Sequence, residues 1–311
     1  MNDFKIVYMG TPDFSVGPLN KLIENNYNVV AVVTQPDKEF GRKKEIKFSD
    51  VKKYALEKNI KVIQPEKIRL DYKEILDLNP DIIITCAYGQ IIPKKLLDYP
   101  KFGCINIHAS LLPKLRGGAP IHKAIIEGYK YTGITIMYMD EKMDSGDIIY
   151  QEKIEIKDDD NAGTLFDKLS DLGSKMIIDI LPSIFNKTNS RIKQNENDVT
   201  YAYNITRKEE KIDFNKNSRD VFNQIRGLNP WPVGYSIFKN KKVKIYSAKI
   251  GNSTKEGVPG EIINIYKDSI GIKTKDGEIL IYELQFEGKK RIFVRDYLNG
   301  LHENIISEKF V

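Results

Sequence analysis

Cysteine and histidine are scarce in this chain of 311 residues, which contains two cysteines and three histidines. Two cysteines are too few for a disulfide framework in a chain of this length. The histidines do not cluster with the cysteines at the spacing of a zinc site, so no bound metal is predicted. These absences favour a reducing, cytoplasmic setting.

Long apolar runs and nucleotide-binding loops are also missing. No apolar run reaches the ~18 residues that a membrane span needs, so no membrane association is expected. After the first strand-like run, Gly10 is the only glycine of the dinucleotide-binding pattern, and Pro12 removes a backbone donor. A nicotinamide or flavin cofactor is therefore not expected. The phosphate-binding P-loop pattern is absent as well.

The net charge of +6 lies entirely in the last third of the chain. Residues 206–311 contain 20 Lys+Arg and 14 Asp+Glu, and the preceding residues are balanced. Such an excess suggests a polyanionic partner for this part only. On charge alone, a lysine-rich solvated surface is the more frequent explanation.

Apolar strand-like runs alternate with helical patterns through residues 1–187. The runs are continuous in Val and Ile, which is typical of strands buried on both faces. This pattern predicts an α/β domain with a doubly wound, mostly parallel, Rossmann-like sheet, closed by a long helix over residues 164–185. The expected strands are residues 4–9, 29–33, 61–63, 81–87, 104–108 and 133–139.

Residues 188–205 are polar, lack periodicity and are predicted to be a linker. Beyond them, residues 206–311 are expected to form a small OB-like β-barrel with one helix at 218–228. Its five expected strands are residues 235–238, 243–248, 261–266, 269–274 and 278–283.

The densest group of reactive side chains lies around the strand at residues 104–108. Asn106 and His108 are two positions apart on this strand, so they project to the same face. They lie at its carboxyl end, where open α/β sheets bind ligands. Asp144 follows the next strand, and adjacent parallel strands would bring it to the same rim.

These three side chains suit the transfer of an acyl group to an amine. His108 can take the proton that the attacking amine loses. Asn106 can stabilise the oxyanion of the tetrahedral intermediate, and Asp144 can orient the imidazole. Each residue alone is more often an ordinary strand-end or turn residue, but together they favour catalysis. Ser110 is the nearest hydroxyl, and it lacks the context of a nucleophilic serine.

At these residues the chain resembles the methionyl-tRNA formyltransferase family, the tRNA branch of the folate-dependent formyltransferases. The resemblance covers essentially the whole length. The matching motifs are residues 10–14 (GTPDF), 34–37 (TQPD), 87–89 (AYG), 106–108 (NIH), 110–113 (SLLP), 116–121 (RGGAPI), 144–147 (DSGD) and 229–232 (NPWP).

The resemblance implies transfer of a formyl group from 10-formyltetrahydrofolate to the α-amino group of methionyl initiator tRNA, for translation initiation. It implies that Asn106, His108 and Asp144 are catalytic and that the enzyme is a monomer. The folate would bind at two loops, formed by Tyr88, Gly89, Ile91, Ser110, Leu111, Leu112 and Pro113.

The resemblance also implies that a loop inserted after the second strand, here residues 34–49, contacts the acceptor stem of the tRNA. This insert is rich in cations, which suits phosphate contact, and its expected tRNA-binding residues are Arg42, Lys43 and Lys44. In the barrel, Lys241, Lys242 and Lys244 fit contacts to the tRNA backbone.

Two alternatives remain open from the residues. A formyltransferase acting on an amino sugar nucleotide or a purine precursor would need the reactive group but not a basic barrel. A non-catalytic RNA-binding protein would need the barrel charge but not Asn106, His108 and Asp144 on one rim.

Overall fold

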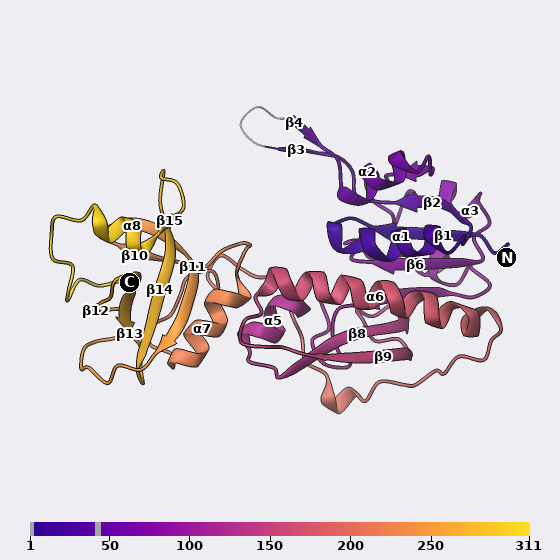
Figure 1. Ribbon diagram of the computed structural model, residues 1–311. Helices are drawn as coiled ribbons and strands as arrows, with labels where there is room; N and C mark the ends of the chain where they lie inside the picture. Colours follow the sequence, from indigo (N-terminus) through magenta and orange to yellow (C-terminus); the bar gives the residue numbers. More distant parts are fainter. Residues whose placement is uncertain (1–2, 41–44) are drawn as a thin grey trace. The chain divides into compact units, whose positions relative to one another are not determined.

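The computed structural model describes residues 3–40 and 45–311, which form two compact units (Figure 1). The first unit comprises Met1–Pro120, Thr132–Ile154 and Phe166–Tyr203, and the second comprises Ile121–Tyr131, Glu155–Leu165 and Asn204–Val311. The predicted fold class is confirmed: a mostly parallel sheet covered by helices is followed by a curled antiparallel sheet.

The first unit is built on a seven-stranded sheet with the order β5-β2-β1-β6-β7-β8-β9. The strands from β5 to β7 are parallel, and β8 runs antiparallel to β7. The continuous Val and Ile runs are buried on both faces, as the sequence predicts. The bounds are β1 Ile6–Gly10, β2 Val29–Val33, β5 Val62–Ile63, β6 Ile82–Cys86, β7 Cys104–His108, β8 Tyr131–Tyr138 and β9 Ile148–Glu155.

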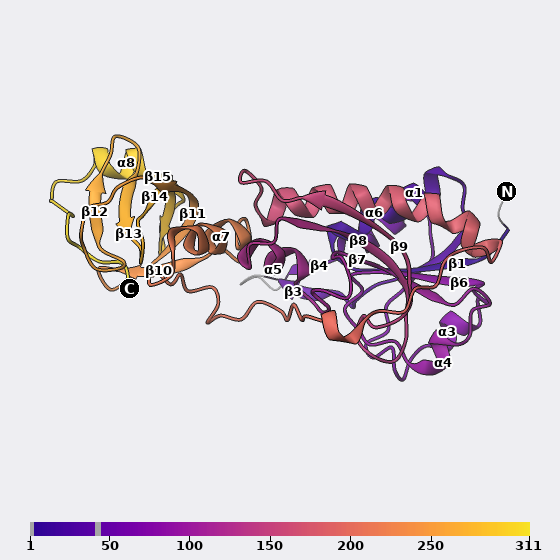
Figure 2. The same cartoon turned by 90° about the horizontal axis from the view of Figure 1, so that it is seen from below.

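Helices cover both faces of this sheet (Figure 2). On one face lie α1 Val16–Glu24, α2 Asp50–Glu57 and the long α6 Ala162–Phe185; on the other lie α3 Lys73–Leu76 and α4 Lys94–Leu97. Helix α6 packs closely on β7 and β8, because Gly173 faces Ile107 and Ile134. The helix continues through Pro182 to Phe185. The short helix α5 Pro120–Ile126 precedes β8.

The inserted segment after β2 carries a small two-stranded sheet, where the sequence suggested only a loop. Strand β3 Lys38–Phe40 pairs antiparallel with β4 Glu45–Lys47. The predicted tRNA-binding residues Arg42, Lys43 and Lys44 lie outside the described residues.

The second unit is dominated by an antiparallel sheet in the order β10-β11-β14-β13-β12, with β15 also paired to β14. Buried and exposed residues alternate along its strands, which places one face on the core. All five predicted strands are present, and β15 is an addition. The bounds are β10 Tyr235–Phe238, β11 Lys241–Gly251, β12 Ile262–Ile265, β13 Ile270–Lys273, β14 Glu278–Phe286 and β15 Ile292–Phe293, with helices α7 Ser218–Gly227 and α8 Val294–Asn299.

None of the helices within residues 3–40 and 45–311 has the length and hydrophobicity that a membrane span requires.

Thr206 and Glu209 of the second unit bond reciprocally across the turn at residues 207–210, in the manner of a capping box. The backbone N–H and the hydroxyl of Thr206 donate to the Glu209 carboxylate at 2.9 and 2.8 Å, and the N–H of Glu209 donates back to the Thr206 hydroxyl at 3.4 Å. The carboxylate also pairs with Lys123. The hydrogen bond from Lys123 outweighs the opposing effect of burial, and with Thr206 it lowers the pKa of Glu209 from 4.5 to about 2.

We expect Glu209→Gln to lower the free energy of unfolding at neutral pH, and this loss to vanish in acid. A carboxyl group whose pKa is depressed by folding stabilises the fold above its ordinary pKa of 4.5, and that contribution is lost as the pH falls toward about 2. Urea unfolding of both proteins across this range measures the difference. Glu210→Gln removes the neighbouring charge and is the control. A difference that stays constant with pH would contradict the expectation.

Candidate active site

Strand β7 presents Asn106 and His108 on the same side of the sheet, at its carboxyl end. Asn106 lies beside Thr85 of β6, and His108 lies beside Thr135 of β8. The His108 side chain is only 6% exposed. Its ring is therefore held by protein groups rather than by water.

Asp144 reaches this rim by a route that differs from the prediction. Because β8 is antiparallel to β7, it ends beside the start of β7, where the N–H of Met139 donates to Cys104 at 2.8 Å. The loop at residues 140–147 then turns back along β7 and carries Asp144 to the far end of that strand. Gly146 permits the close return, since a Cβ atom there would overlap the carbonyl oxygen of Tyr138.

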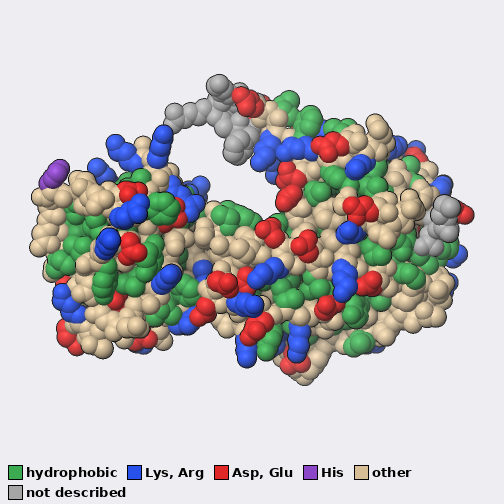
Figure 3. Space-filling view, viewed as in Figure 1, with side chains coloured by type: hydrophobic (Ala, Val, Ile, Leu, Met, Phe, Trp, Pro, Cys, Tyr) green, Lys and Arg blue, Asp and Glu red, His purple; other side chains and the backbone are tan. Residues whose placement is uncertain are grey.

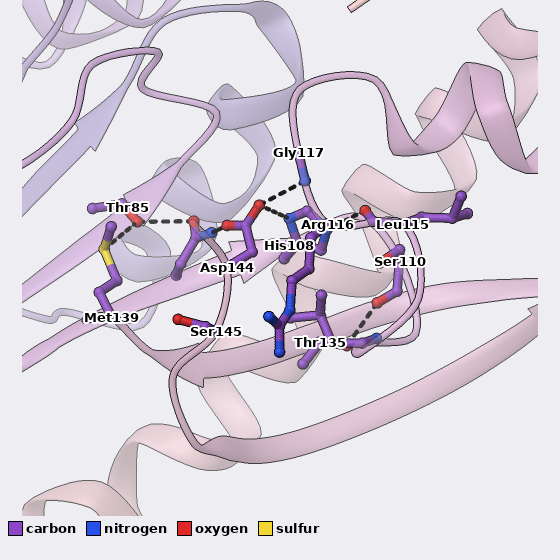
Figure 4. A network of polar contacts seen from close by, with 12 residues as sticks. Thr85, His108, Ser110, Leu115, Arg116, Gly117, Thr135, Met139, Asp144 and Ser145 are labelled. Carbon is purple, nitrogen blue, oxygen red and sulfur yellow. Dashed lines mark hydrogen bonds and ion pairs between the residues drawn. The ribbon is translucent and has the colours of Figure 1, made fainter. Parts of the chain in front are cut away.

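The Asp144 carboxylate is the centre of the site (Figure 4). Its Oδ2 accepts the backbone N–H of Gly117 at 2.8 Å and lies 3.7 Å from Nδ1 of His108. Its Oδ1 lies 3.5 Å from the amide nitrogen of Asn106. The structure therefore brings the three predicted catalytic side chains together around one carboxylate.

The imidazole of His108 is held between two acceptors. Its Nε2 lies 3.1 Å from the carbonyl oxygen of Leu115, and its Nδ1 faces Asp144. A carbonyl oxygen can only accept, so the bond to Leu115 requires a hydrogen on Nε2. Nδ1 is then the nitrogen available to take a proton.

The amide of Asn106 is oriented by a residue that the sequence did not single out. The hydroxyl of Thr85 lies 2.8 Å from Oδ1 of Asn106 and can donate to it. With Oδ1 satisfied in this way, the NH₂ group of Asn106 points to the site. Thr85 is 2% exposed and lies at the equivalent position of the neighbouring strand.

The polar segment after α6 holds the Asp144 loop in place. The amide nitrogen of Gln194 donates to the backbone carbonyls of Asp144 and Gly146 at 2.8 and 2.9 Å. The side-chain oxygen of Gln194 in turn accepts from Arg116 at 2.8 Å, and Arg116 pairs with Glu196 at 3.0 Å. Residues predicted as a linker thus form the outer wall of the site.

Arg116 is only 3% exposed, an unusual environment for an arginine. The motif at residues 116–121 was the one sequence signal for its importance. No sequence signal indicated a role for Gln194 or Glu196, because they lie in a segment without periodicity or motif. Gly117, next to Arg116, has φ of +122°, which a glycine adopts readily and which lets its N–H reach Asp144.

The loop at residues 110–113 is rigidly built. The hydroxyl of Ser110 donates to the carbonyl of Lys114 at 2.6 Å, so it closes the loop. Thr135 donates to the carbonyl of Ser110, and the side chain of Gln151 donates to that of Leu112. Leu112 is buried, whereas Leu111 and Pro113 are partly exposed and are available to a ligand.

The second predicted folate loop follows β6. The Tyr88 ring is buried in the core, which raises the pKa of its hydroxyl to about 12, so only its backbone can face a ligand. Gly89 has φ of +87°, and Ile91 is 63% exposed. A hollow of about 400 Å³ lies beside this loop, lined by Lys67, Arg69, Leu70, Gln90 and Ile91.

Among the predicted barrel residues, Lys242 and Lys244 share one face. They alternate along β11 with the buried Val243 and Ile245, so both project from the outer surface. The ammonium of Lys242 lies 3.7 Å from the centre of the Tyr235 ring. Lys241 is at the first position of β11, exposed but on the opposite side by alternation. Figure 3 shows cations interspersed with apolar side chains over this unit.

Within the described parts of the chain, no group of three or more His, Cys, Asp or Glu side chains is placed to hold a metal ion.

The chain belongs to the formyl transferase family. The domain described as "Formyl transferase" matches residues 4–181, and "Formyl transferase, C-terminal domain" matches residues 204–302. The prediction that the chain is a formyltransferase enzyme is confirmed.

Its similarity to individual proteins points to one branch of the family. The chain is 51% identical to the methionyl-tRNA formyltransferase of Lysinibacillus sphaericus (strain C3-41), covering 95% of each chain. It is 49% identical to that of Bacillus subtilis (strain 168), covering 96% of this chain and 95% of the relative. The predicted resemblance to methionyl-tRNA formyltransferases is thus confirmed.

The fold is shared with more distant solved structures. HypX from Aquifex aeolicus in complex with tetrahydrofolic acid matches with a TM-score of 0.67 at 15% identity, covering 96% of this chain and 47% of that chain.

We expect Gln194→Leu to lower kcat about 10- to 100-fold, because a misplaced catalytic group loses its productive geometry. The KM for the formyl donor should change little, since the partners of Gln194 among the described residues are the Asp144 loop and Arg116. Steady-state formyl transfer measures both. Asn195→Leu is the control, because Asn195 bonds only within its own turn. Equal kcat for the two variants would contradict a positioning role.

Proposed function

We propose that this chain transfers the formyl group of 10-formyltetrahydrofolate to the α-amino group of methionyl initiator tRNA. The observation that carries the proposal is the convergence of Asn106, His108 and Asp144 at one strand end, in a chain about 50% identical to methionyl-tRNA formyltransferases over 95% of its length. In this proposal residues 1–187 are catalytic, 188–205 connect the domains, and 206–311 bind tRNA. The enzyme would act as a cytoplasmic monomer.

His108 accepts the proton that the attacking amine loses. The hydrogen bond to Leu115 keeps a hydrogen on Nε2, so Nδ1 takes the proton as the amine attacks the formyl carbon. The protonated Nδ1 lies 3.7 Å from the Asp144 carboxylate. Its negative charge stabilises the imidazolium and holds the ring in place.

Asn106 supports the negative charge that develops on the formyl oxygen. The Thr85 hydroxyl engages its oxygen, which leaves the NH₂ group facing the site with only the long contact to Asp144 at 3.5 Å. An N–H donor in this place stabilises the oxyanion. When the intermediate collapses, the bond between the formyl carbon and N10 of the folate breaks. The proton from His108 passes to the leaving tetrahydrofolate.

The folate would bind between the two loops, at Tyr88, Gly89 and Ile91 and at residues 110–113. The neighbouring hollow supports this placement, because Leu70 and Ile91 are 80% and 63% exposed and offer apolar surface to an aromatic ring. Lys67 and Arg69 line the same hollow and suit the carboxylates of the folate tail.

The tRNA would be bound through its phosphates by the insert and the barrel. We keep Arg42, Lys43 and Lys44 as the proposed contacts of the insert. In the barrel, the shared face of Lys242 and Lys244 with Tyr235 supports a phosphate-binding surface, since cations interleaved with aromatic rings suit nucleic acid. Lys241 stays a proposed contact at the start of β11, on the opposite side of the strand from this face.

A comparison of acceptors tests the proposed function. The purified chain is incubated with 10-formyltetrahydrofolate and with methionyl initiator tRNA, free methionine or an amino sugar nucleotide. We expect formylation of the tRNA alone. His108→Ala should reduce turnover about 10²- to 10⁴-fold, the usual contribution of a general base, with tRNA binding retained.

Failure on the tRNA, or equal rates with free methionine, would overturn the proposal. Activity only on the amino sugar nucleotide would favour the related formyltransferase, and tRNA binding without any transfer would favour an RNA-binding protein. Wild-type turnover in His108→Ala would refute the role of His108.

Salt dependence of tRNA binding tests the barrel surface. We expect Lys242→Met and Lys244→Met each to reduce the slope of log K against log salt concentration by about 1, the contribution of one phosphate contact. Lys241→Met should have a smaller effect. Lys275→Met, at an exposed turn between β13 and β14, is the control. The same slope in all four variants would rule out this face.

A further inference from the structure

A network of polar side chains joins the base of the insert to the folate loop after β6. It lies wholly within the first unit, at the carboxyl ends of β2, β5 and β6. Its members are Gln35 and Asp37 at the start of the insert, Lys52 in α2, Gln64 after β5 and Gln90 in the folate loop. None of them belongs to the reacting group around Asp144.

Gln64 is the junction on the side of the insert. Its amide nitrogen donates to the carbonyl of Gln35 and to the carboxylate of Asp37, both at 2.9 Å, and its oxygen accepts from Lys52 at 2.7 Å. Both hydrogens and the oxygen of one amide are therefore engaged. Turning the amide over would place its oxygen against two acceptors and its nitrogen against an ammonium.

Lys52 contacts the insert through Asp37 and Phe48. Its ammonium pairs with Asp37 at 2.6 Å and lies 4.0 Å from the centre of the Phe48 ring, so it holds residues near both ends of the insert. Its side chain is only 13% exposed. Although desolvation acts to raise the pKa of Asp37, its hydrogen bonds with Lys52 and Gln64 lower the pKa overall, so the carboxylate stays charged.

Gln35 carries the connection to the folate loop. Its backbone carbonyl accepts from Gln64, and its side-chain nitrogen donates to the carbonyl of Tyr88 at 3.0 Å. Its side-chain oxygen accepts from Gln90 at 3.4 Å. Gln90 also accepts the N–H of Ile68, beside the hollow at Lys67 and Arg69. A continuous chain of hydrogen bonds therefore runs from Asp37 to the folate loop.

We propose that Gln35, Gln64 and Lys52 are positioning residues that couple the two substrates, an inference that rests on the proposed function. Binding of the folate strengthens binding of the tRNA, and binding of the tRNA strengthens binding of the folate. A ligand that orders the loop of Tyr88 and Gln90 also fixes the Gln35 side chain, which bonds to both residues. Gln64 then links the Gln35 backbone to Asp37 and so fixes the base of the insert. The tRNA held by the insert acts through the same bonds in the opposite direction. Such coupling is reciprocal by thermodynamic necessity.

Binding measurements with tetrahydrofolate test the proposal, because this product carries no formyl group and no transfer occurs. Its Kd is measured by calorimetry alone and with saturating methionyl initiator tRNA. For the wild type we expect at least about fivefold tighter binding with tRNA, the lower end of usual coupling. The Kd of the tRNA should fall by the same factor with saturating tetrahydrofolate.

In Gln64→Leu and Lys52→Met we expect the tRNA to change the Kd of tetrahydrofolate by less than about twofold. Thermal melting of both variants shows that they fold. Lys53→Met is the matched control, because Lys53 is on the same helix but is 48% exposed and, among the described residues, forms its ion pair with Asp50 outside the network. It removes the same charge and should keep the wild-type factor.

Three results would overturn the proposal. A wild-type factor of one, with formylation of the tRNA intact, would refute coupling and leave the proposed function standing. An unchanged factor in Gln64→Leu and Lys52→Met would show that coupling does not pass through the network. Failure of the wild type to formylate the tRNA would refute the proposed function and the coupling together.

Discussion

The partly buried carboxylate of Asp144 is the constraint on which the rest of the site depends. It lies against His108, Asn106 and the N–H of Gly117, groups that come from β7 and from the loop after it. A carboxylate with little access to water needs such partners, because desolvating an unpaired charge is costly. Its place is therefore set by the end of β7, the turn at Gly117 and the return of the loop after β8. Gln194, itself held by Arg116, binds that loop through two backbone carbonyls.

Much of the fold and the grouping of side chains at the candidate site could be predicted from the sequence, for reasons visible in particular residues. The Val and Ile runs of β1, β2, β6 and β7 identified the sheet, and the spacing of Asn106 and His108 put them on one face. The direction of β8 could not be predicted, since an apolar run is the same in either direction. Gln194 and Thr85 were missed because their role lies in contacts with residues 50 and 21 positions away.

The two kinds of evidence for function come from separate parts of the molecule. The proposed catalytic side chains belong to the first unit, and their chemistry suits proton transfer and oxyanion stabilisation without selecting an acceptor. The lysines that favour a polyanion lie on β11 in the second unit. Within the first unit, the network around Gln64 also connects the insert to the proposed folate loop after β6, without any contribution from Asn106, His108 or Asp144.

The position of Gln194 along the chain also affects when the candidate active site can form during synthesis. Gln194 follows Asp144 by 50 residues, and the long helix α6 lies between them. At ribosomal rates of about 5–20 residues per second, the Asp144 loop emerges roughly 3–10 s before the side chain that anchors it. A nascent chain that already has β7, β8 and their loop is therefore still without a complete site. Assembly of the candidate site is thus completed only after α6 has been synthesised.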